Sequence, residues 1–180
     1  MKLIETGLKD LVLIESNVFH DERGYFFEGF NKDSCSELGL KIEVAQTNIS
    51  QSQKGVVRGL HFQNPPYAQG KLIRVMQGAV LDVAIDIRKS SDTFGKHYSV
   101  ELNDENKLAL WIPPGFAHGF KTLKDKTLFY YNCTEVYNKQ AEGSIKWNDP
   151  ELGINWEIEN PIVSEKDQNA PMFKDFESQF

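Results

Sequence analysis

The stretch Ala79-Val-Leu-Asp-Val-Ala-Ile-Asp-Ile-Arg88 alternates between apolar side chains and polar or small ones. Leu81, Val83, Ile85 and Ile87 share one parity, whereas the other parity carries two aspartates and an alanine. A period of two is typical of a β-strand, because successive side chains of a strand point to opposite faces of the sheet. The stretch therefore predicts a strand within a β-sheet.

Short strand candidates also occur on both sides of this stretch. They are separated by turns rich in Gly, Pro, Asn and Asp, and they cover residues 11–14, 25–30, 43–52, 55–63, 71–77, 96–102, 107–112 and 127–134. Only two short helices are expected, one over 34–38 that Asn31 can cap and Gly39 can end, and one over 164–170. We therefore expect an all-β fold, an antiparallel jelly-roll barrel with a few short peripheral helices, in one domain over residues 1–180.

Composition and charge exclude several classes of protein. The net charge is -6 and no run of Lys or Arg interleaves with aromatic residues, so no nucleic-acid groove is expected. No apolar run approaches the length of a membrane span, and the first residues lack the apolar core of a signal peptide. Cys35 and Cys133 belong to no C-x-x-C motif, so neither a zinc ribbon nor a redox motif is expected. A cytoplasmic protein without a membrane or nucleic-acid partner fits these observations.

The segment Gly55-Val-Val-Arg-Gly-Leu-His-Phe-Gln63 is where we expect the chemistry. In a regular strand, Arg58 and His61 would lie on opposite faces. A glycine inside a strand often marks a bulge, so a bend at Gly59 would change this arrangement. Taken alone, His61 would rather be a hydrogen-bonded histidine of the core, but the residues found downstream favour a functional role.

Two fragments resemble the halves of the cupin signature. Gly55 is followed by His61, and Pro113-Pro-Gly-Phe-Ala-His118 fits the pattern P-x-G-x-x-H. Metal-binding cupins carry a second histidine two positions after the first, where this chain has Gln63, and no carboxylate follows within 64–68. Because a catalytic metal usually has three protein ligands, we expect a cupin-like barrel without a metal.

Several longer motifs resemble the dTDP-4-dehydrorhamnose 3,5-epimerase family. They are Arg58–Gln63, Gln69–Lys71, Ala84–Arg88, Trp111–Phe120 and Glu142–Asp149. The resemblance runs from about Val18 to Pro171. It implies a jelly-roll homodimer that makes dTDP-4-keto-L-rhamnose from dTDP-4-keto-6-deoxy-D-glucose without a cofactor. The strand candidate at 11–14 is a segment through which such a dimer could pair.

The chemistry of a 4-keto sugar explains the catalytic residues that the resemblance selects. The ketone acidifies the hydrogens on C3 and C5, so epimerisation requires a base, a stabiliser of the enolate and an acid on the opposite face. The resemblance assigns the base to His61, its charge-stabilising partner to Asp167, the cation at the enolate oxygen to Lys71 and the acid to Tyr131.

Three of these residues have local alternatives. Asp167 stands three residues after Ser164, so the two could simply form a helix capping box. Lys71 could be an exposed lysine of an edge strand. Tyr131 could be an ordinary residue of the hydrophobic core within an aromatic strand.

The resemblance also implies a nucleotide site. Cations would bind the diphosphate, and an aromatic ring would stack on thymine. The assigned residues are Arg23, Arg58 and Lys166 for the phosphates, Glu28, Gln46, Asn48 and Glu142 for polar contacts, and Tyr137 for thymine. His118 and Asp82 are placed near the sugar, where either could contact it or orient His61 or Lys71.

Two other functions remain open at this point. One is a single-position epimerase, acting at C3 or C5 of a related nucleotide 4-keto sugar. The other is a non-catalytic sugar-binding cupin, in which the four catalytic candidates would not have to converge.

Overall fold

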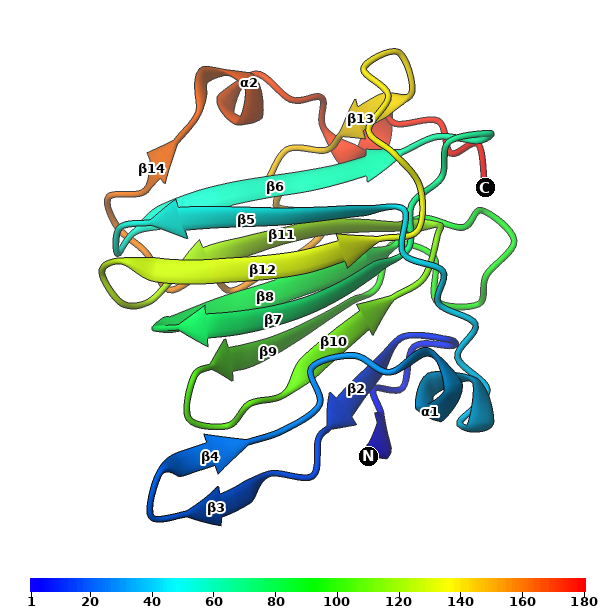
Figure 1. Ribbon diagram of the computed structural model, residues 1–180. Coiled ribbons are helices and arrows are strands. Elements are labelled where there is room, and N and C mark those ends of the chain that lie inside the picture. The colour runs from blue at the N-terminus through cyan, green and yellow to red at the C-terminus, as the bar shows by residue number, and fades with distance from the viewer.

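The computed structural model describes residues 1–180 and consists mainly of short strands in two facing sheets (Figure 1). The first sheet has the order β1-β2-β10-β7-β12-β5, and every pair in it is antiparallel. Its strands are β1 (Lys2–Glu5), β2 (Val12–Glu15), β10 (Ala109–Ile112), β7 (Lys71–Gln77), β12 (Thr127–Cys133) and β5 (Gln46–Ser52).

The second sheet has the order β13-β6-β11-β8-β9, and a short strand, β14, adds to β6 in parallel. Its strands are β13 (Glu142–Ser144), β6 (Val56–Gln63), β11 (Phe116–Thr122), β8 (Ala79–Asp86), β9 (His97–Asn103) and β14 (Ile162–Val163). The prediction of an all-β, largely antiparallel fold is confirmed.

The side chains between the two sheets form the main hydrophobic core. This core combines residues of β7, β10 and β12 with residues of β8, β9 and β11. Phe129 of β12 and Phe120 of β11 stack with their ring centroids 4.2 Å apart. Stacked aromatic rings add to the burial of apolar surface, so this contact joins the two sheets.

Strand β8, which lies within the alternating stretch 79–88, is buried on both faces. Val80 and Ala84 pack in the core between the sheets. Val83 and Ile85 pack instead in a second cluster, which the C-terminal part of the chain covers with residues such as Trp156. The predicted strand is confirmed. Its alternating apolar side chains Val83 and Ile85 face the C-terminal part of the chain.

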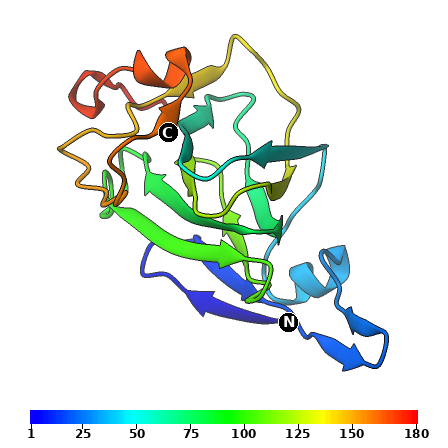
Figure 2. The ribbon, with the colours of Figure 1, turned by 90° about the vertical axis from the view of Figure 1, so that its left-hand side faces the viewer.

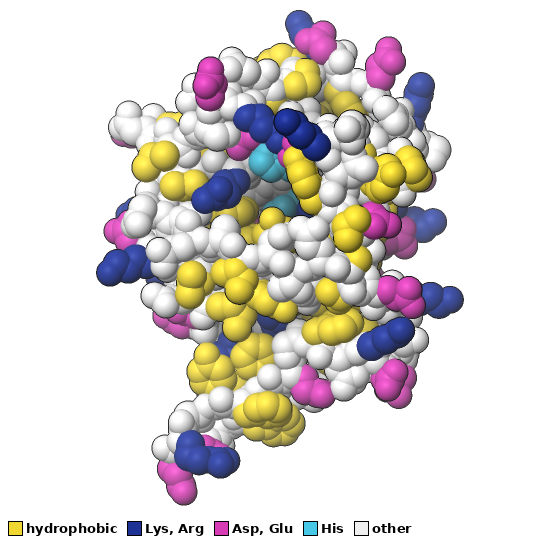
Figure 3. Space-filling view, turned by 45° about the horizontal axis from the view of Figure 1, so that its top comes forward, with side chains coloured by type: hydrophobic (Ala, Val, Ile, Leu, Met, Phe, Trp, Pro, Cys, Tyr) yellow, Lys and Arg dark blue, Asp and Glu magenta, His cyan; other side chains and the backbone are white.

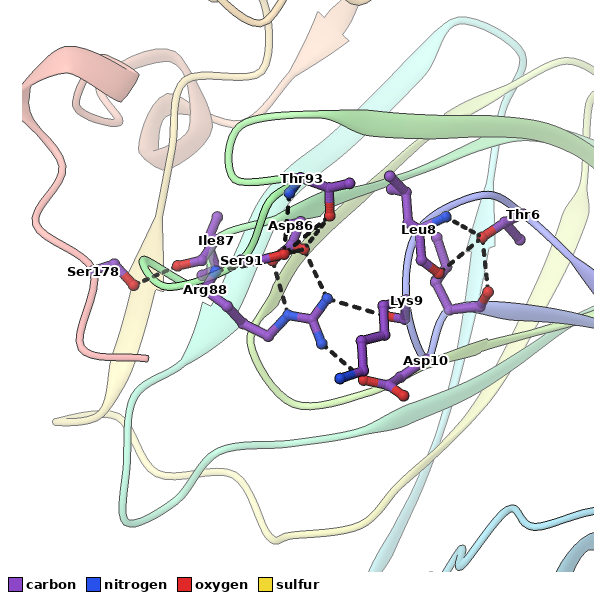
Figure 4. Close-up of polar contacts among 11 residues, drawn as sticks. Thr6, Leu8, Lys9, Asp10, Asp86, Ile87, Arg88, Ser91, Thr93 and Ser178 are labelled. Atoms are coloured by element: carbon purple, nitrogen blue, oxygen red, sulfur yellow. Dashed lines mark hydrogen bonds and ion pairs between the residues drawn. The ribbon is translucent and has the colours of Figure 1, made fainter.

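A polar network at the end of β8 ties both ends of the chain to the barrel (Figure 4). Arg88 forms an ion pair with Asp10, at 3.0 Å, and the Ser178 hydroxyl donates to the main-chain carbonyl of Ile87. Asp86 is fully buried at the centre of the network. Its carboxylate accepts hydrogen bonds from Arg88 Nη2 at 2.7 Å, Ser91 Oγ at 2.6 Å and Thr93 Oγ1 at 2.7 Å.

The helices are short and peripheral, as predicted. Helix α1 (Lys32–Glu37) begins after Asn31, whose side chain accepts hydrogen bonds from the first turn. Helix α2 (Glu165–Gln168) is shorter than expected, and a 3₁₀ turn, η1 (Phe173–Asp175), follows it. The longest helix has six residues, whereas a bilayer crossing takes about 20.

The N-terminal region departs from the prediction in two places. The strand predicted at 25–30 is reduced to β4 (Gly24–Phe26), which pairs only with β3 (Phe19–Asp21) in a hairpin that projects from the barrel (Figures 1 and 2). No third strand lies beside β4 to extend the pairing. Strand β2 pairs with β1 on one side and with β10 on the other, so the segment 11–14 has no free edge for a partner.

Candidate active site

A cavity of about 780 Å³ opens between the two sheets. Its walls come from β5, β7 and β12 on one side and from β6 and β11 on the other, and the β14–α2 segment beside β6 also contributes side chains. Figure 3 looks into this cavity, with histidine inside and Lys and Arg side chains around the opening. Most of the sequence-predicted site residues line it, namely Gln46, Asn48, Arg58, His61, Lys71, His118, Tyr131, Tyr137, Glu142, Lys166 and Asp167.

A bulge in β6 places Arg58 and His61 on the same wall. Their partners on β11 are Phe120 and His118, which are two residues apart, so β6 carries one extra residue between the pairs. The bulge includes Gly59, whose φ is +128°. A Cβ added there would lie 2.5 Å from a main-chain atom of β11, so only glycine fits. The bend predicted at Gly59 is confirmed.

His61 and Asp167 form a hydrogen-bonded pair on this wall. His61 Nε2 donates to Asp167 Oδ1 at 2.7 Å, and the Gly59 N–H donates to Asp167 Oδ2 at 3.2 Å. Burial acts to raise the pKa of Asp167, but the bond from His61 and the further hydrogen bonds hold it below its usual value. The charged carboxylate therefore occupies Nε2 and leaves Nδ1 of His61 available to a ligand.

The start of helix α2 explains how Asp167 reaches this position. Ser164 is the N-cap, and its Oγ accepts a hydrogen bond from the Asp167 N–H at 3.1 Å. The Asp167 side chain takes no part in the cap and points to His61 instead. The two interpretations of the sequence are therefore compatible, because the cap uses the main chain and leaves the carboxylate free.

Lys71, at the start of β7, is buried, and its strand is paired on both sides. It is therefore not an exposed lysine on a sheet edge. Its Nζ lies 3.4 Å from the main-chain oxygen of His61. Burial lowers the pKa of Lys71, although nearby acidic groups oppose the effect. A buried ammonium beside His61 can stabilise a negative oxygen in the cavity.

Tyr131 reaches the cavity from the facing sheet. It lies on β12, paired with Asn48 of β5 and Ile73 of β7, and packs against Phe129 with ring centroids 5.7 Å apart. Burial is the main cause that raises the pKa of Tyr131 above its usual value. Its phenol therefore keeps its proton at neutral pH and can donate it.

A second His–Asp pair lies deeper in the barrel. His118 of β11 lines the cavity, and its Nε2 donates to Asp82 Oδ2 at 2.9 Å. Asp82 of β8 is fully buried and does not line the cavity. Its position orients His118, which lies directly opposite His61 in the register of β6 and β11.

Charged and aromatic side chains surround the mouth of the cavity. Lys166 Nζ lies 2.5 Å from Glu142 Oε1, and the Tyr137 hydroxyl donates to Glu142 Oε2 at 3.2 Å. Burial acts to raise the pKa of Glu142, but Lys166 holds it below its usual value. Arg58 uses Nε in a hydrogen bond to Ser52 at 3.2 Å. Lys166 and Arg58 give this region cations suited to a phosphate.

Some residues of the cavity had no role in the sequence interpretation. Ser50 stands on β5 at the same parity as Gln46 and Asn48, and this spacing is the signal that could have placed it in the cavity. Gln63 and Gln69 also line the cavity. Both stand within motifs that carry the family resemblance, but nothing in their spacing indicates what they contact.

Two predicted binding residues lie outside the cavity. Arg23, near the tip of the β3–β4 hairpin, has a side chain that is 86% exposed and paired with Asp21. Glu28 follows β4 and accepts a hydrogen bond from Asn31 at 2.9 Å. Because the hairpin projects from the barrel (Figure 1), the structure does not bring Arg23 and Glu28 into the site of their own chain.

The structure holds no group of three His, Cys, Asp or Glu side chains that could bind a metal ion. His61 and His118 each use Nε2 in a bond to an aspartate. Gln63, at the position of a cupin ligand, bonds to main-chain groups of neighbouring loops. The absence of an activating metal stays a prediction.

A jelly roll of two antiparallel sheets with a polar cavity between them defines a cupin-like protein that binds a small ligand. The model of the family described as dTDP-4-dehydrorhamnose 3,5-epimerase matches residues 5–175. A curated relative of that name from Shigella flexneri is 51% identical over 176 residues, which are 97% of each chain. The chain belongs to the dTDP-4-dehydrorhamnose 3,5-epimerase family, whose members are isomerases.

Solved structures agree with this assignment. The dTDP-4-dehydrorhamnose 3,5-epimerase from Elizabethkingia anophelis NUHP1 has a TM-score of 0.93 at 53% identity, over 97% of both chains. The dTDP-6-deoxy-D-glucose-3,5-epimerase from Legionella pneumophila Philadelphia 1, in complex with dTDP-4-keto-L-rhamnose, has a TM-score of 0.93 at 43% identity, over 98% of this chain and 94% of that one. The predicted family and the predicted cupin-like jelly roll are confirmed.

Proposed function

We propose that this protein converts dTDP-4-dehydro-6-deoxy-D-glucose to dTDP-4-dehydro-L-rhamnose by inverting C3 and C5. One observation carries the proposal: His61 and Tyr131 reach one cavity from two facing sheets. A base and an acid on opposite sides of a sugar can remove a proton from one face and return one to the other. Membership of the epimerase family supports the choice of substrate.

In the proposed reaction, His61 acts as the base through Nδ1, because Nε2 is bound to Asp167. It takes a proton from the carbon next to the ketone, and the electron pair of the broken C–H bond moves into an enolate. The ammonium of Lys71 stabilises the enolate oxygen. Tyr131 then gives its proton to the opposite face of the carbon, which forms the inverted C–H bond. Solvent restores both residues before the second carbon reacts.

This chemistry needs neither a redox cofactor nor a metal ion, since the C–H bond breaks heterolytically and Lys71 supplies the charge that the enolate requires. Activity is therefore expected to survive treatment with a chelator. Full loss of activity after chelation, restored by a divalent ion, would refute this part of the proposal.

The remaining predicted residues bind the nucleotide sugar in this proposal. Arg58 and Lys166 contact the diphosphate, and Tyr137 stacks on thymine. Asp82 orients His118 toward the sugar. The polar contacts to the nucleotide sugar come from Gln46, Asn48, Glu142 and His118.

We also propose a two-fold homodimer in which the β3–β4 hairpin of each chain reaches the cavity of the other. The hairpin exposes large apolar side chains, with Phe19 62% and Phe26 65% exposed, and such a patch favours a protein partner. Arg23 and Glu28 would then bind substrate in the partner's cavity. In this proposal residues 1–180 act as one domain, and the enzyme works in the cytoplasm.

The test is to incubate the protein with dTDP-4-keto-6-deoxyglucose and to determine the product by NMR. Inversion at both C3 and C5 is the expected result. Inversion at one carbon alone would instead identify a single-position epimerase. Binding of the sugar nucleotide without any inversion would identify a non-catalytic sugar-binding cupin.

A further inference from the structure

The segment that joins β12 to β13 (yellow in Figure 1) carries Tyr137 at the mouth of the cavity. Residues 134–138 belong to no helix or strand. Their main-chain N–H and C=O groups therefore need partners other than a regular hydrogen-bond ladder. Three glutamine side chains from separate parts of the chain supply four of these partners.

Gln46 and Gln69 each hold the segment at one point. The Gln46 Oε1 accepts a hydrogen bond from the Tyr137 N–H at 2.8 Å. The Gln69 Nε2 donates to the Glu135 carbonyl at 2.7 Å. These two bonds connect the segment to β5 and to the turn before β7.

Gln63 holds the segment at two points, one on each side of Tyr137. Its Nε2 donates to the Val136 carbonyl at 3.2 Å, and its Oε1 accepts from the Asn138 N–H at 2.7 Å. The same Nε2 donates to the Tyr67 carbonyl at 2.7 Å. Gln63 is nearly inaccessible to solvent, at 4% exposure, so water cannot readily replace these bonds.

We propose that Gln63 and Gln69 are positioning residues that fix the Tyr137 ring for the nucleotide base, an inference that rests on the proposed function. They act on Tyr137 through the main chain of residues 135–138 and not on the reacting sugar. An amide suits this task because it both donates and accepts hydrogen bonds, whereas a carboxylate only accepts them. The same bonds explain why Gln63 occupies the position of a cupin metal ligand.

The consequence for binding follows from the exposure of Tyr137. Tyr137 is 53% exposed, and its side chain makes one hydrogen bond, from its hydroxyl to Glu142. Without Gln63 or Gln69, the nucleotide would have to order the segment when it binds, which weakens the affinity. The chemical step between His61 and Tyr131 does not depend on that ordering.

The test measures the dissociation constant (Kd) of dTDP by calorimetry. It compares three full-length proteins, the wild type, Gln63→Leu and Gln69→Leu. The matched control is Gln51→Leu, because Gln51 is exposed on β5 and makes no side-chain hydrogen bond. We expect Kd to rise about tenfold in both variants, since each loses at least one hydrogen bond to the segment. We expect KM to rise with Kd, kcat to stay within about threefold, and the control to bind as the wild type does.

A double-mutant cycle with Tyr137→Ala separates positioning from a general structural role. In the Tyr137→Ala background, Gln63→Leu should change Kd by less than about twofold, because its target is gone. An unchanged Kd in both single variants, or a full tenfold effect without Tyr137, would overturn the proposal. If Gln63→Leu does not fold, Gln69→Leu decides, since it loses a single bond. Wild-type protein that binds dTDP but inverts no sugar would overturn the proposed function and leave this comparison valid.

Discussion

The carboxylate of Asp167 accepts a hydrogen bond from His61 Nε2 at 2.7 Å, although 106 residues separate the two in the sequence. The bulge at Gly59 turns His61 into the cavity, and the cap at Ser164 directs Asp167 toward it. In the proposed reaction His61 takes a proton, and its positive charge would then develop next to the negative charge of Asp167. The hydrogen bond fixes the orientation of the His61 ring, and in the proposed reaction the carboxylate would stabilise the protonated form of His61.

Replacing Asp167 by Asn should lower kcat by about 100- to 10,000-fold, with little change in KM. The amide keeps the shape of the side chain but lacks the charge that stabilises protonated His61. Steady-state kinetics of Asp167→Asn measure the effect. Glu165→Gln is the control, because Glu165 is an exposed carboxylate of the same helix that does not line the cavity. Equal loss of kcat in both variants would contradict the role given to Asp167.

The alkaline decline of kcat is expected to report on Lys71. Burial lowers the pKa of Lys71 below its ordinary value of 10.5 and raises that of Tyr131 above its ordinary value of 10.0. Deprotonation of Lys71 would remove the cation at the enolate oxygen, and its lowered pKa moves this loss toward lower pH. Lys71→Arg stays charged and should move the decline to higher pH. The test is the dependence of kcat on pH in the wild type and in Lys71→Arg. If kcat declines at the same pH in both proteins, Lys71 is not the group that causes the decline.

Mixing two inactive variants tests whether the hairpin serves the partner's cavity. Arg23→Ala removes a hairpin cation, and His61→Asn removes the base. In a mixed dimer, one cavity would combine the intact His61 of the first chain with the intact Arg23 of the second, so activity should reappear. Activity of the mixture after exchange of subunits measures this. If Arg23 acts within its own chain, or if the protein is monomeric in light scattering, mixing restores nothing.

The network around Asp86 predicts how stability depends on acid. Burial acts to raise the pKa of Asp86, but the bonds from Arg88, Ser91 and Thr93 outweigh it and lower the pKa to about 2. The folded state thus binds fewer protons than the unfolded state, so the stabilisation is complete above the ordinary pKa of 3.8 and is lost as the pH falls through about 2. This difference corresponds to about 2 kcal/mol.

Asp86→Asn should therefore lower the free energy of unfolding at pH 7 and flatten its dependence on pH between 4 and 2, roughly the interval between the two pKa values. Urea unfolding across this range measures both effects. Asp92→Asn is a matched control in the same turn region, because Asp92 makes no side-chain hydrogen bond or ion pair. Equal acid sensitivity of Asp86→Asn and the wild type would show that Asp86 is not the group responsible.

The sequence allowed much of the fold and of the cavity to be predicted, because local chemistry determines these features. The alternation of β8 and the cap at Asn31 depend on neighbouring residues alone. The bulge at Gly59 is predictable for the same reason, since a glycine within a strand pattern commonly marks a bulge or a close approach of two backbones.

Other features depend on partners that spacing does not reveal. The bonds of Gln63 reach main-chain groups at Val136 and Asn138, more than 70 residues away. The family resemblance assigns Arg23 to the phosphates, but nothing in the sequence indicates that Arg23 lies outside the cavity of its own chain. The segment 11–14 was expected to have a free edge, and only the observed pairing of β2 with both β1 and β10 shows that it has none.

The central claim is that His61 removes the proton and Tyr131 returns one to the opposite face. Its most direct test is incubation of the wild type, His61→Asn and Tyr131→Phe with the keto sugar in deuterium oxide, with label and configuration determined by NMR. His61→Asn should show neither exchange at C3 and C5 nor inversion, because no enolate forms. Tyr131→Phe should lose inverted product by roughly 100- to 10,000-fold and yet keep exchanging hydrogen, because His61 still removes a proton and returns one to the same face. Exchange that persists undiminished in His61→Asn would contradict the account and assign the base to another residue.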